Sequence, residues 1–277
     1  MSHSKCLVIA EAGINHGGKL ITAIEMADAA KSVGADIVKY QTYNTHKLLR
    51  PNDPAYNELR ALELQPHEWV ALAKYCEGAK IEFLTTPGDL DSLKFAVEEL
   101  GVKRIKIGSD DLTNVKLVEA AHDTGLPLIL STGMADVPEI VAATRFIWQF
   151  ALLHCVSLYP CPVEKANLRS IPYLHDAFKC KVGYSDHTAN SKVVLAAVAA
   201  GAQIIEVHFM LDPLSVDEPQ PIDACVSFAL SDLRDMIYQI RETELYMGSY
   251  GKVPTSLERT KAPLLRKGSD GLRGLAA

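Results

Sequence analysis

The sequence predicts an α/β fold, a (β/α)8 TIM barrel, on two observations. Short apolar or β-branched runs alternate with helical patterns along the chain, and eight of each can be counted. Ionisable residues stand at or near the ends of several apolar runs, namely Glu11, Lys39, Lys106, His187 and His208. The strand ends of a parallel barrel meet on one face, where barrel enzymes carry their active sites. We therefore expect an enzyme with one barrel over residues 1–249 and a basic tail over residues 250–277.

Composition fits this expectation. The chain has 277 residues, of which 48% are hydrophobic and 22% are charged, as is usual for a globular domain. A net charge of -6 gives no electrostatic case for binding nucleic acid. The apolar runs are too short to span a membrane, and the scattered cysteines predict buried free thiols rather than disulfides. These features predict a cytoplasmic protein.

The expected strands are the apolar runs, several of them continuous as in strands buried on both faces. They are Cys6–Ile14, Ile37–Thr42, Glu82–Pro87, Arg104–Ser109, Pro127–Thr132, Ala151–Ser157, Lys181–His187 and Ile204–Phe209. An open doubly wound sheet is the alternative, but it usually has fewer repeats and often a Gly-x-Gly-x-x-Gly turn, which this chain lacks.

The expected helices place apolar residues at helical spacing, and several are followed by a glycine that can end a helix. They are Ile21–Val33, His67–Ala79, Asp89–Leu100, Asn114–Thr124, Val137–Phe150, Leu168–Phe178, Ser191–Ala200 and Phe228–Met247. Two segments fall outside the repeat. Thr45–Pro66 is too long for an ordinary loop and is a candidate lid, and Tyr250–Ala277 is the basic tail.

Two histidines end neighbouring expected strands, and this placement favours a metal site. Neutral imidazoles of His187 and His208 can share one divalent ion and leave positions open for water and a substrate oxygen. An open site of that kind suits the polarisation of a carbonyl group. The alternative is that each histidine is simply a hydrogen-bonded polar residue at the barrel mouth.

Two lysines break apolar runs, which is costly unless they meet an anion. Lys39 and Lys106 can form a cradle for phosphate and carboxylate with the hydroxyl residues at other strand ends. Those hydroxyl residues are Thr86, Ser109, Ser131, Ser157 and Ser185. A Schiff-base lysine is a competing interpretation, and structural ion pairs with Glu11 or Glu206 are another.

Residues two apart on a strand face the same way, so three pairs can address one pocket. The pairs are Lys39 with Gln41, Ser185 with His187, and Glu206 with His208.

Eight motifs, taken together and in order over residues 6–250, resemble the sialic acid synthase family, which includes legionaminic and pseudaminic acid synthases. The motifs are Ala10-Glu11-Ala12-Gly13-Ile14-Asn15-His16-Gly17-Gly18, Lys39-Tyr40-Gln41-Thr42, Thr85-Thr86-Pro87, Lys106-Ile107-Gly108-Ser109, Ser131-Thr132-Gly133-Met134, His154-Cys155-Val156-Ser157-Leu158-Tyr159-Pro160, Gly183-Tyr184-Ser185-Asp186-His187-Thr188 and Glu206-Val207-His208-Phe209. Each motif alone would be weak evidence, whereas the joint match is highly specific.

The resemblance implies condensation of phosphoenolpyruvate with an open-chain N-acetylated amino sugar, such as N-acetylmannosamine, to a nonulosonic 2-keto acid and phosphate. It implies a divalent metal, usually Mn²⁺ with Mg²⁺ or Co²⁺ as alternatives, held by His187 and His208, with Glu11 as the catalytic carboxylate. The implied phosphoenolpyruvate contacts are Lys39, Thr86, Lys106, Ser109, Ser131, Ser157 and Ser185. The implied acceptor-facing residues are Gln41, Tyr159, Glu206 and Asp223.

The chain departs from the family pattern in three places. Asp110-Asp111 follows Ser109 where the family more often has Gly-Glu, and Leu211–Asp223 differs from the usual loop. We expect the sequence given to hold the barrel domain only, whereas family members usually continue into a C-terminal antifreeze-like domain that offers an arginine to the acceptor across a dimer. Either the acceptor differs, or another chain supplies these contacts, or the sequence is a piece of a longer protein. We therefore expect a homodimer in which the lid or the tail helps to cover the cavity.

Two other functions stay open. One is a phosphoenolpyruvate-dependent synthase that acts on a different or phosphorylated aldose, which would need a further cationic site. The other is a non-catalytic anion-binding barrel with a regulatory or scaffold role.

Overall fold

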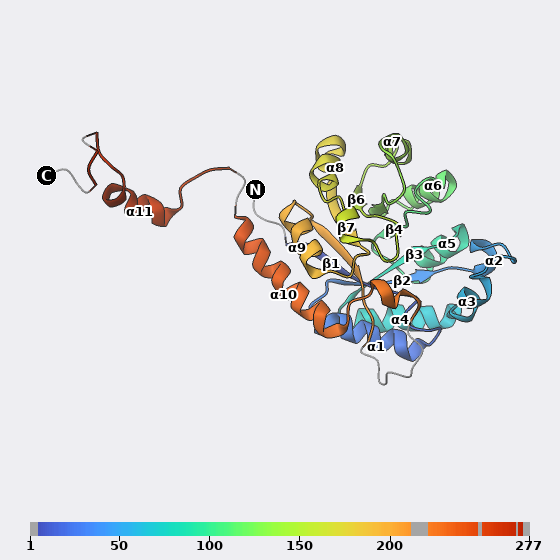
Figure 1. Ribbon diagram of the computed structural model, residues 1–277. Coiled ribbons are helices and arrows are strands. Elements are labelled where there is room, and N and C mark those ends of the chain that lie inside the picture. Colours follow the sequence, from blue (N-terminus) through green and yellow to red (C-terminus); the bar gives the residue numbers. More distant parts are fainter. Residues whose placement is uncertain (1–4, 212–220, 249–250, 270, 274–277) are drawn as a thin grey trace. The chain divides into compact units, whose positions relative to one another are not determined.

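The computed structural model describes residues 5–211, 221–248, 251–269 and 271–273. Eight parallel strands form one sheet in the order β3-β2-β1-β8-β7-β6-β5-β4, and its two outer strands lie side by side, so the barrel is nearly closed (Figure 1). The strands are β1 (Leu7–Gly13), β2 (Ile37–Thr42), β3 (Glu82–Pro87), β4 (Ile105–Ile107), β5 (Leu128–Ser131), β6 (Phe150–His154), β7 (Lys181–Asp186) and β8 (Ile204–His208). The predicted (β/α)8 TIM barrel is confirmed.

A helix follows each strand, as the hydrophobic spacing predicts. The barrel helices are α1 (Leu20–Ser32), α4 (Pro66–Ala79), α5 (Leu90–Glu98), α6 (Val115–Asp123), α7 (Val137–Thr144), α8 (Ser170–Phe178), α9 (Ser191–Ala199) and α10 (Leu230–Met247). Local signals set their ends. Asp136 and Glu139 form a capping box at the start of α7, and Gly34 follows α1 with a φ of 88°.

Several expected elements are shorter than predicted, and two of them lose about half of their expected length. The helix expected over Val137–Phe150 ends at Thr144, because Phe150 must join the sheet opposite Leu128. The strand expected over Arg104–Ser109 contains only Ile105–Ile107.

The candidate lid over Thr45–Pro66 is partly helical. It contains the short helices α2 (Thr45–Leu48) and α3 (Tyr56–Ala61). Within it, the backbone N–H of Thr45 donates to the Glu63 carboxylate at 2.6 Å, which ties its two ends together.

Two compact units divide the chain, one ending at Met247 and the other containing Gly248–Ala277. In the second, the described residues form one helix, α11 (Ser256–Leu265), whose capping box joins Thr255 and Glu258. Among the described segments, no helix is both long and apolar enough to cross a membrane.

The barrel interior is filled at one end by apolar side chains. They form a cluster inside the ring of strands, made of Ile9, Ile37, Leu84, Ile129, Ala151, Leu153 and Ile204. A larger cluster packs the outer faces of the strands against the helices. The apolar plug closes the barrel below the polar residues at the strand ends.

All six cysteines are free thiols, as predicted. Four are buried, whereas Cys180 is partly buried and Cys225 is exposed, so the expectation of burial is wrong for these two.

Candidate active site

Strand periodicity places the polar residues above the apolar plug. Glu11 and Lys39 are partners in the β1–β2 register, two residues beyond Ile9 and Ile37 of the plug. Because side chains two apart share a face, these charged groups enter the same interior one layer higher. They meet at the carboxyl end of the barrel, where the sequence predicts the site.

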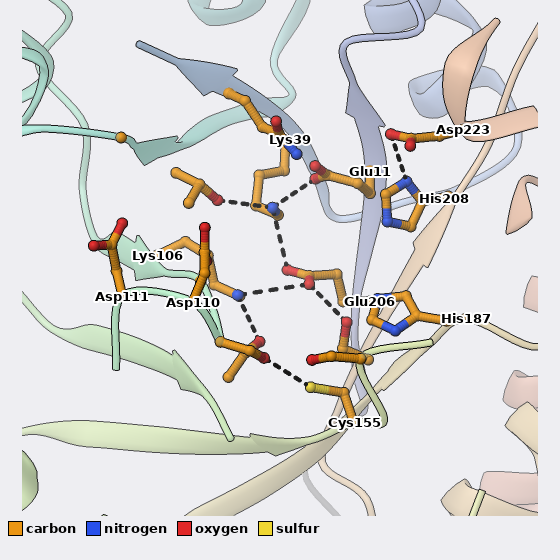
Figure 2. A pocket seen from close by; sticks show the side chains of 18 of the residues that line it. Glu11, Lys39, Lys106, Asp110, Asp111, Cys155, His187, Glu206, His208 and Asp223 are labelled. Carbon is orange, nitrogen blue, oxygen red and sulfur yellow. Dashed lines mark hydrogen bonds and ion pairs between the residues drawn. The ribbon is translucent and has the colours of Figure 1, made fainter. Parts of the chain in front are cut away.

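The structure brings all fourteen predicted site residues to one cavity of about 430 Å³ (Figure 2). They are Glu11, Lys39, Gln41, Thr86, Lys106, Ser109, Ser131, Ser157, Tyr159, Ser185, His187, Glu206, His208 and Asp223. Sequence reasoning did not select several other lining residues, including Tyr43, Leu48, Met134 and Cys155.

The two lysines lie on the cavity floor and are almost completely buried, with 3% and 2% of their surface exposed. Lys39 Nζ lies 2.8 Å from Glu11 Oε2 and donates to Thr86 Oγ1 at 2.9 Å. Lys106 Nζ donates to Ser131 Oγ at 2.6 Å. Buried ammonium groups need such partners, because transfer from water penalises an isolated charge heavily.

Glu206 lies between the two lysines. Its carboxylate oxygens are 3.7 Å from Lys39 Nζ and 3.7 Å from Lys106 Nζ, and Ser185 Oγ donates to it at 2.9 Å. Figure 2 shows this carboxylate joining the two lysines across the floor. The residue that the resemblance assigns to the acceptor therefore holds the lysine pair together in this structure.

The floor groups differ in their proton affinities. Burial alone would raise the pKa of Glu206, but the two lysines hold it well below its usual range. Burial raises the pKa of Glu11 despite the opposing Lys39 charge. Burial also lowers the pKa of Lys106. For Lys39, the negative charges of Glu11 and Glu206 outweigh the effect of burial, and its pKa is raised. Glu206 is thus firmly ionised, and Glu11 is the carboxyl group better able to take up a proton.

His208 ends β8, and His187 directly follows the neighbouring strand β7. Their ring centroids are 5.7 Å apart. His187 Nδ1 donates to the Val156 carbonyl at 2.7 Å, which leaves the lone pair on Nε2. Burial lowers the pKa of His187 to about 4, so its ring is neutral at neutral pH. Tyr159 covers this ring at a centroid distance of 4.1 Å.

Asp223 approaches the second histidine from the segment after β8. It lies on the short 3-10 helix η2 (Ile222–Val226), and its Oδ2 is 3.4 Å from His208 Nδ1. Burial would lower the pKa of His208, but the Asp223 carboxylate raises it. Residues 212–220 of the loop that departs from the family pattern lie outside the described residues.

The histidine pair fits a divalent metal with open coordination positions. One imidazole is fixed in a single tautomer by a backbone carbonyl, the kind of outer contact that orients metal ligands. Within the described parts of the chain, no group of three or more His, Cys, Asp or Glu side chains has metal-binding spacing. Two protein ligands would leave the remaining positions to water and substrate.

A tight cluster of small residues forms another wall. Ser109 Oγ accepts from the Gly133 N–H at 3.0 Å and lies 3.1 Å from Cys155 Sγ. A Cβ atom on Gly133 would overlap Ser157 Oγ and approach Ser109 Oγ to 2.7 Å. A side chain at position 133 would therefore force both serines out of their present positions. The sequence does mark Gly133, because it stands two residues after Ser131 in one of the family motifs.

The loop after β1 supports the site from behind. Asn15 Nδ2 donates to the Phe209 carbonyl at 2.8 Å and to Ser227 Oγ at 3.0 Å, which fixes the segment that carries Asp223. A Cβ on Gly13, where φ is 53°, would lie 3.2 Å from Asp223 Oδ2. Neither supporting role could be read from the motif, because the partners are about 200 residues away in sequence.

The fold and site together define a barrel enzyme with two buried lysines on its cavity floor and a histidine pair beside them. Comparison with protein families matches the NeuB family over residues 26–252, and the chain belongs to this family. It is 36% identical to the N,N'-diacetyllegionaminic acid synthase of Legionella pneumophila, covering 96% of this chain and 80% of that protein.

Two further relatives widen the comparison. The chain is 30% identical to the human N-acetylneuraminate-9-phosphate synthase, covering 88% of this chain and 72% of that protein. Among solved structures, it resembles the crystal structure of an N-acetylneuraminic acid (sialic acid) synthetase from Leptospira borgpetersenii serovar Hardjo-bovis in complex with citrate, with a sequence identity of 35%. That match has a TM-score of 0.88 and covers 94% of this chain and 91% of the other. The family resemblance expected from the motifs is confirmed.

Proposed function

We propose that this protein condenses phosphoenolpyruvate with an open-chain N-acetylated amino sugar to give a nonulosonic 2-keto acid and phosphate. The observation that carries the proposal is the pair of buried lysines beneath two histidines in one cavity. Phosphoenolpyruvate has two anionic groups, and an ammonium with adjacent hydroxyls can bind each of them by charge-assisted hydrogen bonds. The names of the relatives support the same reaction type.

The proposed reaction forms one carbon–carbon bond and one carbon–oxygen bond, the latter from water, and breaks the bridging carbon–oxygen bond of phosphoenolpyruvate. C3 of phosphoenolpyruvate attacks the aldehyde carbon of the sugar, and the aldehyde oxygen takes up a proton. The oxygen of a water molecule then bonds to C2, and that water loses a proton. The C2 hydroxyl of the tetrahedral centre then passes its remaining proton to the departing phosphate as C2 becomes the ketone. Phosphoenolpyruvate, aldose and water thus yield the 2-keto acid and phosphate.

The floor residues bind and orient phosphoenolpyruvate in this proposal. Lys39 and Lys106 hold its charged groups, and the serine wall fixes the direction of C3. Glu206 keeps the two ammonium groups in place. Glu11, whose pKa burial raises, takes the proton released by water at C2.

The two histidines are the proposed metal ligands. His187 and His208 would hold a divalent ion, for which we propose Mn²⁺, and the bound ion would polarise the acceptor aldehyde. Gln41 and Tyr159 also line the cavity and would contact the acceptor sugar.

Phosphate release provides the test. The protein is incubated with phosphoenolpyruvate and Mn²⁺ and with a panel of N-acetyl and di-N-acetyl hexoses, and phosphate and 2-keto acid are measured together. We expect one sugar to yield both products in equal amounts. Phosphate release that no sugar stimulates would contradict the proposal and favour another role for the cavity.

The metal role has its own test. We expect His187→Ala and His208→Ala each to abolish sugar-dependent turnover and to lower the affinity for Mn²⁺ measured by calorimetry. Circular dichroism should show an unchanged fold, because both side chains lie at the cavity and not in the apolar plug. Full activity after EDTA treatment and in both variants would exclude a metal.

A further inference from the structure

The mouth of the cavity is acidic on the side facing β4. Asp110 and Asp111 line it there, and Asp223 lines it beside the histidines (Figure 2). The resemblance implies Gly-Glu more often than Asp-Asp at this place, and sequence reasoning assigned these two residues no role. They are the charged groups that an acceptor sugar would meet above the floor.

The position of the Asp110 carboxylate is set by its own loop. Its Oδ1 lies so close to Gly108 that a Cβ atom there would overlap it. Gly108 follows Lys106 by two residues, so the carboxylate is folded over the end of β4. Burial and the neighbouring carboxylates of Asp110 and Asp89 raise the pKa of Asp111, as expected where like charges crowd together.

Above the floor, the described lining residues offer no lysine or arginine. They include two lysines and no arginine. Both lysines lie on the floor, where Glu11 pairs with Lys39 and Glu206 pairs with both. An acceptor that carried a phosphate would bring its dianion to carboxylates, and the lysines are already required for phosphoenolpyruvate.

The cavity is nevertheless built for a ligand. Glu11 has only 1% of its surface exposed, yet its Oε1 has no hydrogen-bond partner among the described residues. Buried carboxylate oxygens are normally paired. An unpaired one that lines the cavity marks the place of a bound polar group.

We infer that Asp110 is a specificity-determining residue that excludes phosphorylated aldoses and reserves the acceptor pocket for sugars without a phosphate. This inference rests on the proposed function and narrows its substrate class. Family membership does not decide the point, because relatives of similar identity include both a diacetyllegionaminic acid synthase and 9-phosphate synthases. Repulsion between like charges is a recognised way to reject a competing ligand.

The test compares kcat/KM for the best free aldose of the panel with kcat/KM for N-acetylmannosamine 6-phosphate. We expect the wild type to prefer the free sugar by at least about tenfold. We expect Asp110→Asn to narrow that preference by about tenfold, the scale of one removed unit charge near a phosphate. Asp123→Asn, an exposed aspartate at the end of α6 outside the cavity lining, is the matched control and should leave the preference unchanged.

Three outcomes would overturn the inference. If the wild type uses the 6-phosphate as well as or better than any free sugar, the inference fails while the proposed condensation stands. The same holds if Asp110→Asn changes the preference no more than Asp123→Asn does. If neither the free aldoses nor the 6-phosphate release phosphate from phosphoenolpyruvate, the proposed function itself fails and the inference fails with it.

Discussion

Lys106 offers the sharpest test of the floor at the scale of single residues. Lys106→Met removes an ammonium group that donates to Ser131 and leaves Glu206 paired with Lys39. We expect phosphoenolpyruvate binding to weaken by on the order of 1.5–3 kcal/mol, the value of a charge-assisted hydrogen bond. Isothermal titration calorimetry measures the change. Lys94→Met, an exposed lysine of α5, is the control, and equal affinities in both variants would remove Lys106 from the site.

The same lysine allows a covalent alternative to be checked. Burial lowers the pKa of Lys106, which is also what a Schiff-base lysine requires. We expect borohydride treatment in the presence of pyruvate to leave the protein mass unchanged, because the proposed reaction forms no bond between substrate and lysine. A reduced adduct found on Lys106 or Lys39 by mass spectrometry would replace the proposed chemistry with imine chemistry.

At the scale of elements, the space around individual glycines determines how closely strands and helices can pack. Gly183 in β7 lies against the Ile204 backbone carbonyl, and a Cβ atom would overlap it. We expect Gly183→Ala to lower the free energy of unfolding by about 3 kcal/mol, since overpacking against a backbone atom cannot be relieved by a rotamer change. Gly78→Ala in α4 meets no neighbouring atom and should raise stability by about 0.5 kcal/mol. Urea denaturation compares them, and equal midpoints would contradict the packing account.

The loop after β1 should carry a pH-dependent share of stability. His16 packs edge-on against Trp69, and burial lowers its pKa from 6.5 to about 4. Below pH 6.5 the imidazole is protonated in the unfolded chain but stays neutral in the folded protein. The free energy of unfolding therefore decreases as the pH is lowered from 6.5 to about 4, and this histidine causes no further decrease below that pH. The loss is roughly 3 kcal/mol. His16→Gln should flatten that window, whereas a constant stability difference between variant and wild type from pH 4 to 7 would exclude the effect.

Strand identities and inward faces could be predicted from the sequence because period-two alternation fixes which side chains share an interior. Lys39 and Gln41 illustrate this, as both line the cavity where the pattern places them. The end of α7 could not be predicted, because the apolar run continues through Phe146 and Ile147 although the helix stops at Thr144. Only the pairing of Phe150 with Leu128 decides that boundary, and pairing is a tertiary fact.

The sequence predicted which residues line the site better than it predicted how their side chains contact one another. The sequence offered ion pairs between the lysines and Glu11 or Glu206 as an alternative, and the structure contains them. That Glu206 contacts both lysines could not be predicted, because strands β2, β4 and β8 are distant in sequence. Cys155 was missed because a thiol in an apolar run resembles any buried cysteine. Its contact with Ser109 Oγ depends on the closeness of two loops that no spacing rule reports.

Assembly is the first question at the scale of the whole molecule. The eight strands and their helices belong to one compact unit that ends at Met247, so we expect a chain truncated after Ser249 to fold with an unchanged melting temperature. We propose that the full chain is a homodimer whose lid or tail covers the acceptor pocket, which would exclude competing water. Sedimentation and the acceptor KM of the truncated chain test the tail. If both match the full chain, the tail has no part in assembly or closure.

The central claim is that water attacks C2 of phosphoenolpyruvate only after its C3 has joined a sugar. The most direct measurement uses phosphoenolpyruvate with a heavy oxygen isotope at the bridging position, together with Mn²⁺ and the preferred aldose, and follows the label by mass spectrometry. We predict that the heavy oxygen leaves entirely in the phosphate, in a one-to-one ratio with the new 2-keto acid, because the carbon–oxygen bond breaks. Unlabelled phosphate, or labelled phosphate released equally fast without the sugar, would contradict the account.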